Sequence, residues 1–437
     1  MESFINKNIV DNKRKELSIA SVSTASIREI TKLINELEAA TGESFIRMEM
    51  GVPGIEPTQA AIEAEIAALH RGVASKYPNI EGVPELKVEM PRFVKNFIGV
   101  DVPASCCVPS VGSMQGGMAA FLVTTRCHEG RDVSLFIDPG FPVQKTQMQT
   151  LGLKYETFDV FNYRGEKLRD KLETYLLKGD IASIIYSNPN NPSWISFTEK
   201  ELKIIAELAD KYDVIAIEDL AYFGMDFRTD ISTSGQPPYQ PSVANYTDNF
   251  VLLISSSKAF SYAGQRIGFV AYSEKLGKRR FPALKRNFMF DEFSRTMIFG
   301  ALYALSSGVT HSVQYGFAAM LKAANDGTYN FIEHIKIYGE KAQIMKKLFT
   351  DNGFYIVYDN DEGRPLADGF YFTVAYPGLD GEELLSELLY YGISAISLGT
   401  TGSDCTQGLR ACTSLIRMDQ MSALEERLKL FHQHHTS

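Results

Sequence analysis

The sequence predicts an α/β protein with a large domain and a smaller α+β domain. The large domain is expected to hold a mostly parallel seven-stranded sheet covered by helices on both faces. Short apolar runs alternate with amphipathic segments through the middle of the chain, as in a buried parallel sheet. The length of 437 residues exceeds what one simple core holds. After residue 325 the pattern changes, and we expect the smaller domain there.

Three ranges describe the expected domains. Residues 1–55 form an N-terminal arm and part of the small domain, 56–324 the large domain, and 325–437 the small C-terminal domain. The spacing of apolar residues predicts helices over 24–40, 59–72, 198–212 and 330–353. Continuous apolar runs predict strands over 133–137, 181–186, 213–217, 250–254 and 267–272. The link between the last two strands is too short for a crossover helix, which allows a mixed edge strand.

Four of the predicted strands end in polar or turn-forming residues. The clusters are "DPGF", "SNPNNP", "EDLAY" and "SSSK". In open α/β sheets, ligands bind outside the carboxyl ends of the strands. We therefore expect these four clusters to meet along one edge of the sheet.

Composition narrows the class of protein. The net charge of −9 argues against a broad basic face for nucleic acid. No apolar stretch of about 18 residues predicts a membrane span, and the N-terminus lacks the apolar core of a secretory signal. The five cysteines include no C-x-x-C pair, so we expect a reducing cytoplasm, no disulfides and no metal site.

Lys258 follows three serines at the end of a predicted strand, with Arg266 shortly after it. Taken alone, it could be a lysine in solvent. Lysine forms Schiff bases when it reacts as the free amine, and arginine suits bidentate phosphate binding. Together these residues favour a phosphorylated aldehyde held covalently.

Other strand ends supply acidic, amide and phenol groups. Asp219 could pair with a protonated heterocycle nitrogen, or could cap a helix. Tyr222 could donate to the same ligand, or could be an ordinary half-buried tyrosine. Asn191 lies in a rigid turn and can offer an amide donor.

Three further positions suit a phosphorylated ring. The amides of Ser113 and Met114 lie where a glycine-broken loop enters a helix, which makes a phosphate cradle. Phe141 could stack on a flat ring, or could pack in the core. Arg410, in a predicted strand of the small domain, needs an anionic partner: an internal acid or a substrate carboxylate.

Taken together, these residues resemble the class I/II aminotransferases, the fold-type I family of pyridoxal-phosphate enzymes. The resemblance runs from "SIREI" near residue 26 to "LRACTS" near 410. It is carried by the order of the motifs "EMGVPGIEP", "KYPNIEGVPELK", "NPNNPS", "EDLAY" and "SSSKAFSYAGQRIGF". One departure from the family pattern is Trp194, which stands where the family has glycine. This difference leaves open the backbone path of the loop and the shape of the substrate channel.

The resemblance implies pyridoxal 5'-phosphate as cofactor and a role for each matched residue. Lys258 would form the aldimine and move protons, and Asp219 would pair with the ring nitrogen. Other implied cofactor contacts are Asn191 and Tyr222 to the phenolic oxygen, Phe141 to the ring, and Ser113, Met114, Ser255 and Arg266 to the phosphate. Tyr77 would reach the phosphate of the neighbouring subunit, which implies a homodimer. Arg410 and Gly51 would lie at the substrate carboxylate.

The function that the resemblance implies is amino-group transfer between an amino acid and a 2-oxo acid. A carbon–sulfur β-lyase or another Cα reaction on the same fold stays open, because each begins with the same proton loss. A ligand-sensing domain and a phosphate-binding enzyme without covalent cofactor attachment are further alternatives. Arg295 could meet a second substrate carboxylate or lie at the surface.

Overall fold

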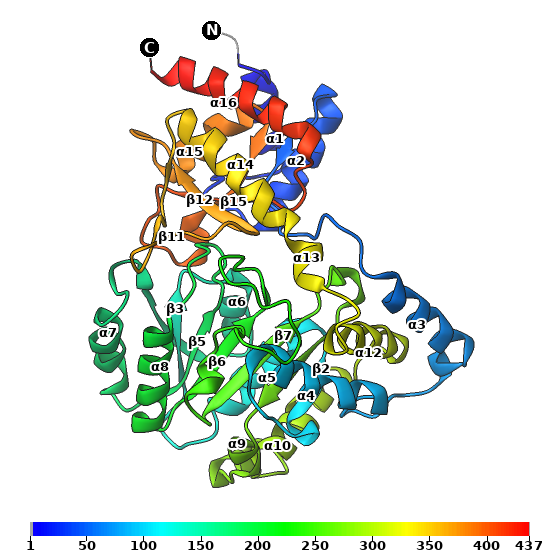
Figure 1. The fold of residues 1–437 in the computed structure, drawn as a ribbon. Helices are drawn as coiled ribbons and strands as arrows, with labels where there is room; N and C mark the ends of the chain where they lie inside the picture. The colour runs from blue at the N-terminus through cyan, green and yellow to red at the C-terminus, as the bar shows by residue number, and fades with distance from the viewer. Residues whose placement is uncertain (1–2, 437) are drawn as a thin grey trace.

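A seven-stranded sheet forms the centre of the computed structural model, which describes residues 3–436 (Figure 1). Neighbouring strands pair in parallel, except that β8 runs antiparallel to both β7 and β2. The predicted, mostly parallel sheet is thereby confirmed. In spatial order the strands are β2 (Cys107–Ser110), β8 (Gly268–Tyr272), β7 (Phe250–Ser255), β6 (Ile215–Leu220), β5 (Ile181–Ser187), β3 (Val133–Asp138) and β4 (Lys154–Asp159).

The antiparallel strand β8 lies inside the sheet and not at its edge, which corrects the expectation of a mixed edge strand. The edge beside it is β2, a strand of four residues that the apolar pattern did not reveal. β2 contains Pro109, which has no N–H to donate. Proline is tolerated in edge strands because one side of such a strand makes no ladder hydrogen bonds.

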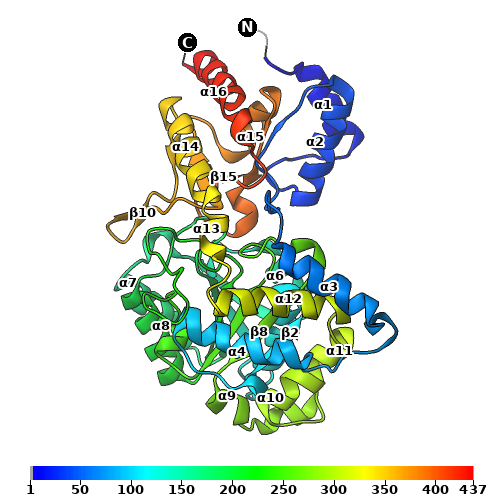
Figure 2. The same ribbon diagram turned by 45° about the vertical axis from the view of Figure 1, so that its right-hand side comes forward.

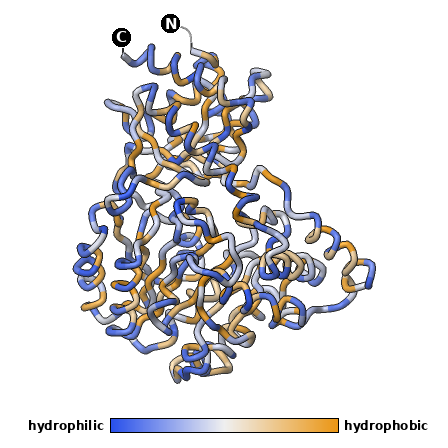
Figure 3. The backbone as a smooth tube through the Cα atoms, in the orientation of Figure 1, coloured by the Kyte–Doolittle hydropathy of each residue, from blue (hydrophilic) through white to orange (hydrophobic). Residues whose placement is uncertain are grey.

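Helices cover both faces of the sheet, because alternate strand residues enter two different cores. Leu252 and Ile254 of β7 pack in one core, whereas Val251 and Leu253 pack in the other. The first core includes residues of α4 (Pro84–Ile98), α7 (Lys167–Leu176), α8 (Glu199–Tyr212) and α12 (His311–Asn325). The second includes residues of α5 (Gly112–Thr124), α6 (Pro142–Thr150) and the π-helix η7 (Thr296–Leu302). In Figure 3, hydrophobic segments (orange) occur throughout the lower part of the molecule, which holds this sheet.

Shorter elements complete this large unit, by which we mean the seven-stranded sheet and the helices around it. They are the helices α3 (Gln59–His70), α9 (Glu274–Lys278), α10 (Phe293–Arg295) and α11 (Tyr303–Ser306), and the 3-10 turns η1 (Val73–Ser75), η2 (Ala104–Cys106), η3 (Val160–Asn162), η4 (Val243–Asn245), η5 (Ala263–Gln265) and η6 (Pro282–Arg286). None of the helices within residues 3–436 combines the length and apolar character that crossing a bilayer requires.

A small unit joins the two ends of the chain above the large sheet (Figure 2). Its core draws on residues between 5 and 48 and between 345 and 431, so the N-terminal segment packs here as expected. Its antiparallel sheet has the order β14 (Ile396–Ser397), β15 (Leu409–Cys412), β12 (Tyr371–Ala375) and β9 (Tyr355–Ile356). The domain boundaries at residues 55 and 324 stay a prediction.

The other elements of the small unit are two strand pairs, several helices and short turns. The pairs are β1 (Ile46–Arg47) with β13 (Ile393–Ser394), and β10 (Asn360–Asp361) with β11 (Arg364–Pro365). The helices and turns are α1 (Lys7–Glu16), α2 (Ile27–Thr41), α14 (Ile337–Asp351), α15 (Gly381–Tyr390), α16 (Met421–His435), η8 (Leu398–Thr401) and η9 (Met418–Gln420). Helix α13 (Phe331–Ile335) leads into α14, and its buried residues pack in the first core of the large unit.

Local sequence explains where several helices begin. Ser26 before α2 and Thr198 before α8 each form a capping box with a glutamate three residues on. The single helix expected over 330–353 is instead two helices, α13 and α14, which meet at Lys336. There the Gly339 N–H donates to the Lys336 carbonyl, three residues back, at 2.9 Å, so the helical turn tightens.

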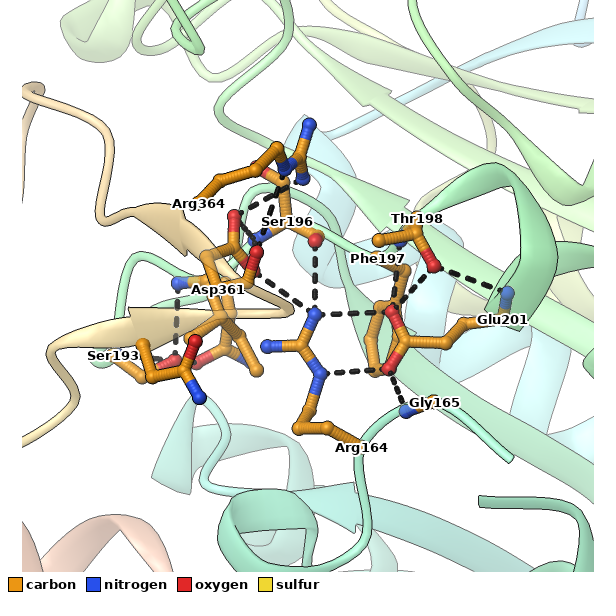
Figure 4. Close-up of polar contacts among 12 residues, drawn as sticks. Arg164, Gly165, Ser193, Ser196, Phe197, Thr198, Glu201, Asp361 and Arg364 are labelled. Carbon is orange, nitrogen blue, oxygen red and sulfur yellow. Dashed lines mark hydrogen bonds and ion pairs between the residues drawn. The ribbon is translucent and has the colours of Figure 1, made fainter. Parts of the chain in front are cut away.

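A buried ionic network joins the small unit to the large unit (Figure 4). Arg164 lies between two fully buried carboxylates, Glu201 of α8 at 2.7 Å and Asp361 of the β10–β11 hairpin at 2.9 Å. Asp361 also accepts from Arg228 at 2.7 Å and from the Ser196 N–H at 3.3 Å. The hairpin of the small unit is thus bonded to the loop that follows β5.

We expect Asp361→Ala to lower the free energy of unfolding by about 3 kcal/mol, because it leaves buried arginines short of a counter-charge. Urea unfolding can be followed by the fluorescence of Trp194, the single tryptophan, whose side chain is fully buried. Glu274→Ala breaks an exposed pair with Lys278 and is the control. Equal unfolding midpoints for the two variants would contradict a stabilising role of the network.

Candidate active site

The carboxyl ends of β5, β6 and β7 lie at the edge of the large sheet that faces the small unit. Asn191, after β5, accepts a hydrogen bond from Arg410 of β15 at 3.3 Å. Tyr222, after β6, shares a hydrogen bond of 2.8 Å with Tyr371 of β12. The clusters after β5 and β6 therefore both meet the small unit at this edge.

Lys258 is half-buried just past β7, and its amine donates to the carbonyl of Gly51. The amine also lies 5.4 Å from the centre of the Phe370 ring. Burial lowers the pKa of Lys258 to about 8, and the nearby cations Arg410 and Arg266 lower it further. No carboxylate within residues 3–436 forms an ion pair with it. The interpretation as a solvated lysine is therefore wrong, and the lowered pKa gives Lys258 a larger neutral fraction near neutral pH than an ordinary lysine has.

Asp219 is a buried carboxylate near the end of β6. Its Oδ2 accepts from Gln144 at 2.8 Å, and its Oδ1 accepts from the N–H of Ala221 at 3.1 Å. Burial raises the pKa of Asp219 to about 6, against the lowering effect of these two hydrogen bonds. A turn and not a helix follows, so the contact with Ala221 is local and Asp219 caps no helix. A protonated ring nitrogen would supply the positive charge that this carboxylate lacks.

Arg410 is 1% exposed and is held by neutral partners. Its Nη2 donates to the backbone carbonyl of Glu49 at 2.6 Å, and its Nη1 donates to Asn191 at 3.3 Å. Its Nε is buried, and no residue between 3 and 436 accepts a hydrogen bond from it. Since no acidic side chain within residues 3–436 pairs with it, the alternative of an internal counter-ion is wrong. An unsatisfied guanidinium N–H suits a carboxylate brought in by a ligand.

Ser113, Met114 and Ser255, the residues expected to bind phosphate, lie close to one another. Glycine at position 268 allows this close approach. Ser113 and Met114 occupy the first turn of α5, which no side chain caps. A Cβ atom on Gly268 would lie 3.3 Å from both the Ser113 nitrogen and the Ser255 Cα. The glycine therefore lets the helix terminus and the end of β7 approach each other. Free N–H groups at a helix N-terminus favour an anion.

Arg266 lies beside the same helix terminus. A Cβ atom on Gly112 would lie 2.9 Å from its Nη2, while its Nη1 donates to the Ala263 carbonyl at 2.9 Å. Arg266 is exposed and adopts a left-handed backbone conformation, with φ of 53°. The structure thus brings a guanidinium to the N-terminus of α5.

Neither Phe141 nor Tyr77 forms an aromatic pair within the part of the chain that the structure describes. Phe141 is half-buried before α6, and no aromatic pair within residues 3–436 includes it. That leaves its ring available for a flat ligand and does not support the core-packing alternative. Tyr77 is 92% exposed. The surface alternative for Arg295 fits its exposed position, where it stacks on Phe290 at 4.4 Å.

Trp194 takes over the backbone position of the expected glycine. Its φ of 66° is left-handed, a conformation that costs most residues about 1–3 kcal/mol. Its ring is fully buried and lies edge-on to Tyr222 at 5.5 Å. Gly369 makes room for it, because a Cβ atom there would lie 2.2 Å from the indole. The loop thus keeps a glycine-like course and still delivers Asn191 to Arg410.

Two residues of the site were not anticipated from the sequence. Gln144 donates a hydrogen bond to Asp219. The sequence feature that could have indicated this role is the position of Gln144 in the first helical turn after "DPGF". Tyr371 contacts Tyr222 and lies 4.5 Å beneath the Arg410 guanidinium. Nothing in the local pattern of β12 distinguishes Tyr371 from a core tyrosine.

The residues present fit pyridoxal 5'-phosphate. An amine of lowered pKa lies at Lys258, and a carboxylate that pairs with no cation among residues 3–436 lies at Asp219. An uncapped helix terminus and a guanidinium lie together at Gly112, where phosphate would bind. The orphan Nε of Arg410 remains for a substrate group.

Comparisons with known proteins agree with this geometry. The family model described as "Aminotransferase class I and II" matches residues 44–427. A protein of Methanocaldococcus jannaschii named "Probable aspartate aminotransferase" is 26% identical over 352 residues, covering 78% of this chain and 84% of its own. An "LL-diaminopimelate aminotransferase" of Natranaerobius thermophilus is 23% identical over 332 residues, covering 75% and 78%.

Among solved structures, alanine aminotransferase from Pyrococcus furiosus superimposes with a TM-score of 0.75 and 18% identity. That match covers 96% of this chain and 99% of the other. The predicted fold class is thereby confirmed. The chain belongs to the class I and II aminotransferase family, and it is a transaminase that depends on pyridoxal phosphate.

Proposed function

We propose that Arg410 binds the carboxylate of an α-amino acid, while Lys258 lies beside the amino group and Cα of the same molecule. The observation that carries this assignment is their common anchor on one short backbone segment. Lys258 donates to the carbonyl of Gly51, and Arg410 donates to that of Glu49 at 2.6 Å. An amino acid presents its amino group and its carboxylate on one carbon, so a site for it needs both side chains close together.

The bound cofactor supplies an electron sink for the pair that remains on Cα when its proton leaves. Lys258, as a neutral amine, removes that proton and returns it as general base and acid. Asp219 holds the ring nitrogen in its protonated state, and Phe141 packs on the ring. Asn191 and Tyr222 donate to the phenolic oxygen; burial raises the pKa of Tyr222, so its hydroxyl keeps its proton.

The phosphate is held by Ser113, Met114, Ser255 and Arg266 in this proposal. Each charge-assisted hydrogen bond contributes about 1.5–3 kcal/mol. Several of them keep the cofactor in place when substrate displaces Lys258. Gly51 lies beside the substrate carboxylate, close to Arg410.

The substrates are an amino acid and a 2-oxo acid. The relatives named for aspartate and LL-diaminopimelate make these the first amino donors to test. Their names describe amino transfer and lend no support to a carbon–sulfur β-lyase. The five unpaired cysteines support the reducing cytoplasm expected from the sequence.

A homodimer completes the proposal. The ring of Tyr77 is 92% exposed, so its hydroxyl is free to enter the phosphate site of a second copy. Exposed apolar residues of α3, Ile66 at 48% and Leu69 at 47%, precede it in the chain and support a contact surface there.

The first prediction concerns the pH dependence of cofactor uptake. We expect the uptake rate of the apo-protein to rise with pH and to reach half its maximum near pH 8. The neutral amine is the nucleophile, and the pKa of Lys258 is lowered to about 8. Stopped-flow absorbance measures the rate, and borohydride reduction followed by peptide mass spectrometry locates the label.

Lys258→Ala should abolish the imine absorbance and the borohydride label, while the phosphate contacts still allow non-covalent binding. Lys341→Ala is the matched control. Burial also lowers the pKa of Lys341, and its amine likewise donates to a backbone carbonyl, that of Ser414, at 3.2 Å. A half-maximum near the pKa of an ordinary lysine, or a label elsewhere in the chain, would count against the assignment.

The second prediction concerns Arg410. Arg410→Gln should lower kcat/KM for amino acids by about 10²–10⁴-fold, since two charge-assisted hydrogen bonds to the carboxylate are lost. Cofactor absorbance should persist. Single-turnover absorbance with aspartate measures the effect, and Arg417→Gln, an exposed arginine paired with Asp419, is the control. An unchanged kcat/KM would remove Arg410 from the substrate site.

The third prediction tests whether Tyr77 acts across subunits. Lys258→Ala and Tyr77→Ala chains should each be impaired alone. A mixed dimer should regain activity, because one of its sites combines the intact Lys258 of one chain with the intact Tyr77 of the other. Refolding the variants together and assaying the purified mixed dimer makes the measurement. If the mixed dimer stays as weak as the Tyr77→Ala homodimer, Tyr77 acts within its own subunit or not at all.

A further inference from the structure

Tyr371 contacts three parts of the site: Tyr222, Arg410 and the backbone at Gly51. It is 2% exposed at the start of β12, and its hydroxyl lies 2.8 Å from the hydroxyl of Tyr222. That hydrogen bond is the one its hydroxyl makes within residues 3–436. A buried phenol without this partner would pay the full desolvation cost of a polar group. A phenylalanine at position 371 would fill nearly the same space in the core. Packing therefore does not require the hydroxyl of Tyr371, and its role is the hydrogen bond with Tyr222.

The ring of Tyr371 bears on Arg410. The guanidinium carbon lies 4.5 Å from the ring centre, within the range of a cation–π interaction. This contact orients the plane of the guanidinium without using any of its N–H donors. The Nε–H of Arg410 thus makes no hydrogen bond within residues 3–436.

The Tyr371 hydroxyl also abuts the segment that anchors Lys258. A Cβ atom on Gly51 would lie 1.9 Å from the Tyr371 oxygen, so no side chain fits at that position. The carbonyl of Gly51 accepts from Lys258. One side chain of the small unit thus contacts Tyr222, Arg410 and the backbone beside Lys258.

We propose that Tyr371 is a positioning residue, whose hydroxyl donates to Tyr222 and turns the Tyr222 proton toward the phenolic oxygen of the cofactor. This inference rests on the proposed function of Tyr222. A phenol carries one proton and two acceptor sites. When Tyr222 accepts from Tyr371, its own proton is free for a third group. A chain of such hydrogen bonds also polarises each member, which strengthens the terminal donor.

The relay has a spectroscopic signature. If the Tyr222 hydroxyl becomes a weaker hydrogen-bond donor, more negative charge would remain on the phenolic oxygen of bound pyridoxal phosphate. That oxygen would then hold the proton it shares with the Lys258 nitrogen more tightly. Tyr371→Phe should therefore raise the apparent pKa of the absorbance band of pyridoxal phosphate bound at Lys258. We expect a rise of about 0.5–1, and a larger rise for Tyr222→Phe. A purely structural role of Tyr371 would not move this titration.

Two further variants make the test specific. In the Tyr222→Phe background, Tyr371→Phe should add no further rise, because the relay passes through Tyr222. Replacing Tyr371 with 3-fluorotyrosine, a similar but more acidic phenol, should lower the apparent pKa. Tyr272→Phe is the matched control: Tyr272 is fully buried, and its hydroxyl lies 2.9 Å from that of Ser294, on a strand end away from Lys258.

The outcomes separate this inference from the proposed function. If wild-type protein shows no borohydride-trapped label at Lys258, the proposed function fails. If wild type and Tyr222→Phe behave as expected but Tyr371→Phe leaves the titration unchanged, or adds its effect to that of Tyr222→Phe, the relay alone is overturned. Trp194 fluorescence verifies the folding of each variant, and the fluorotyrosine protein tests the relay even if Tyr371→Phe does not fold.

Discussion

The site depends on two backbone carbonyls two residues apart in the chain, those of Glu49 and Gly51. They receive Arg410 and Lys258, which would otherwise repel each other in a buried space. The segment is itself anchored, because the fully buried Glu49 side chain accepts from Ser394 at 2.5 Å and pairs with Arg47 at 2.9 Å. Carbonyl oxygens stabilise both groups without neutralising them. Arg410 therefore keeps an N–H for a carboxylate, and Lys258 keeps a reactive amine.

This arrangement places the chemistry at the junction of two units with separate cores (Figure 1). Lys258, Asp219 and Tyr222 come from the large sheet, whereas Arg410 and Tyr371 come from the small one. Their spacing depends on how the units meet, and buried charges such as Arg164 and Asp361 contribute to that contact. A buried ion pair tolerates little displacement, since separating its members exposes each to an environment without a counter-charge. The units are thus held in a defined relation.

Much of the fold could be predicted because it follows from local pattern. Five of the strands of the large sheet are continuous apolar runs, and the polar residues after them mark the edge where ligands bind. β2 was missed because it is four residues long and contains Pro109. The position of β8 was wrong for the same reason: without β2, it had no neighbour on its outer side. The break at Lys336 was missed because apolar spacing continues through it.

The sequence by itself determined the chemical inventory and its order along the chain, since Lys258, Asp219, Asn191 and Arg410 each stand in a motif whose residue types the chemistry requires. The tertiary structure alone decided the pairings. Tyr222 and Tyr371 are separated by 149 positions, and Arg410 and Asn191 by 219. No spacing rule reaches across such distances, because the contact arises from the packing of two units. The sequence likewise does not reveal whether Arg410 pairs with an acidic side chain of the same chain. The folded structure shows no such pair within residues 3–436.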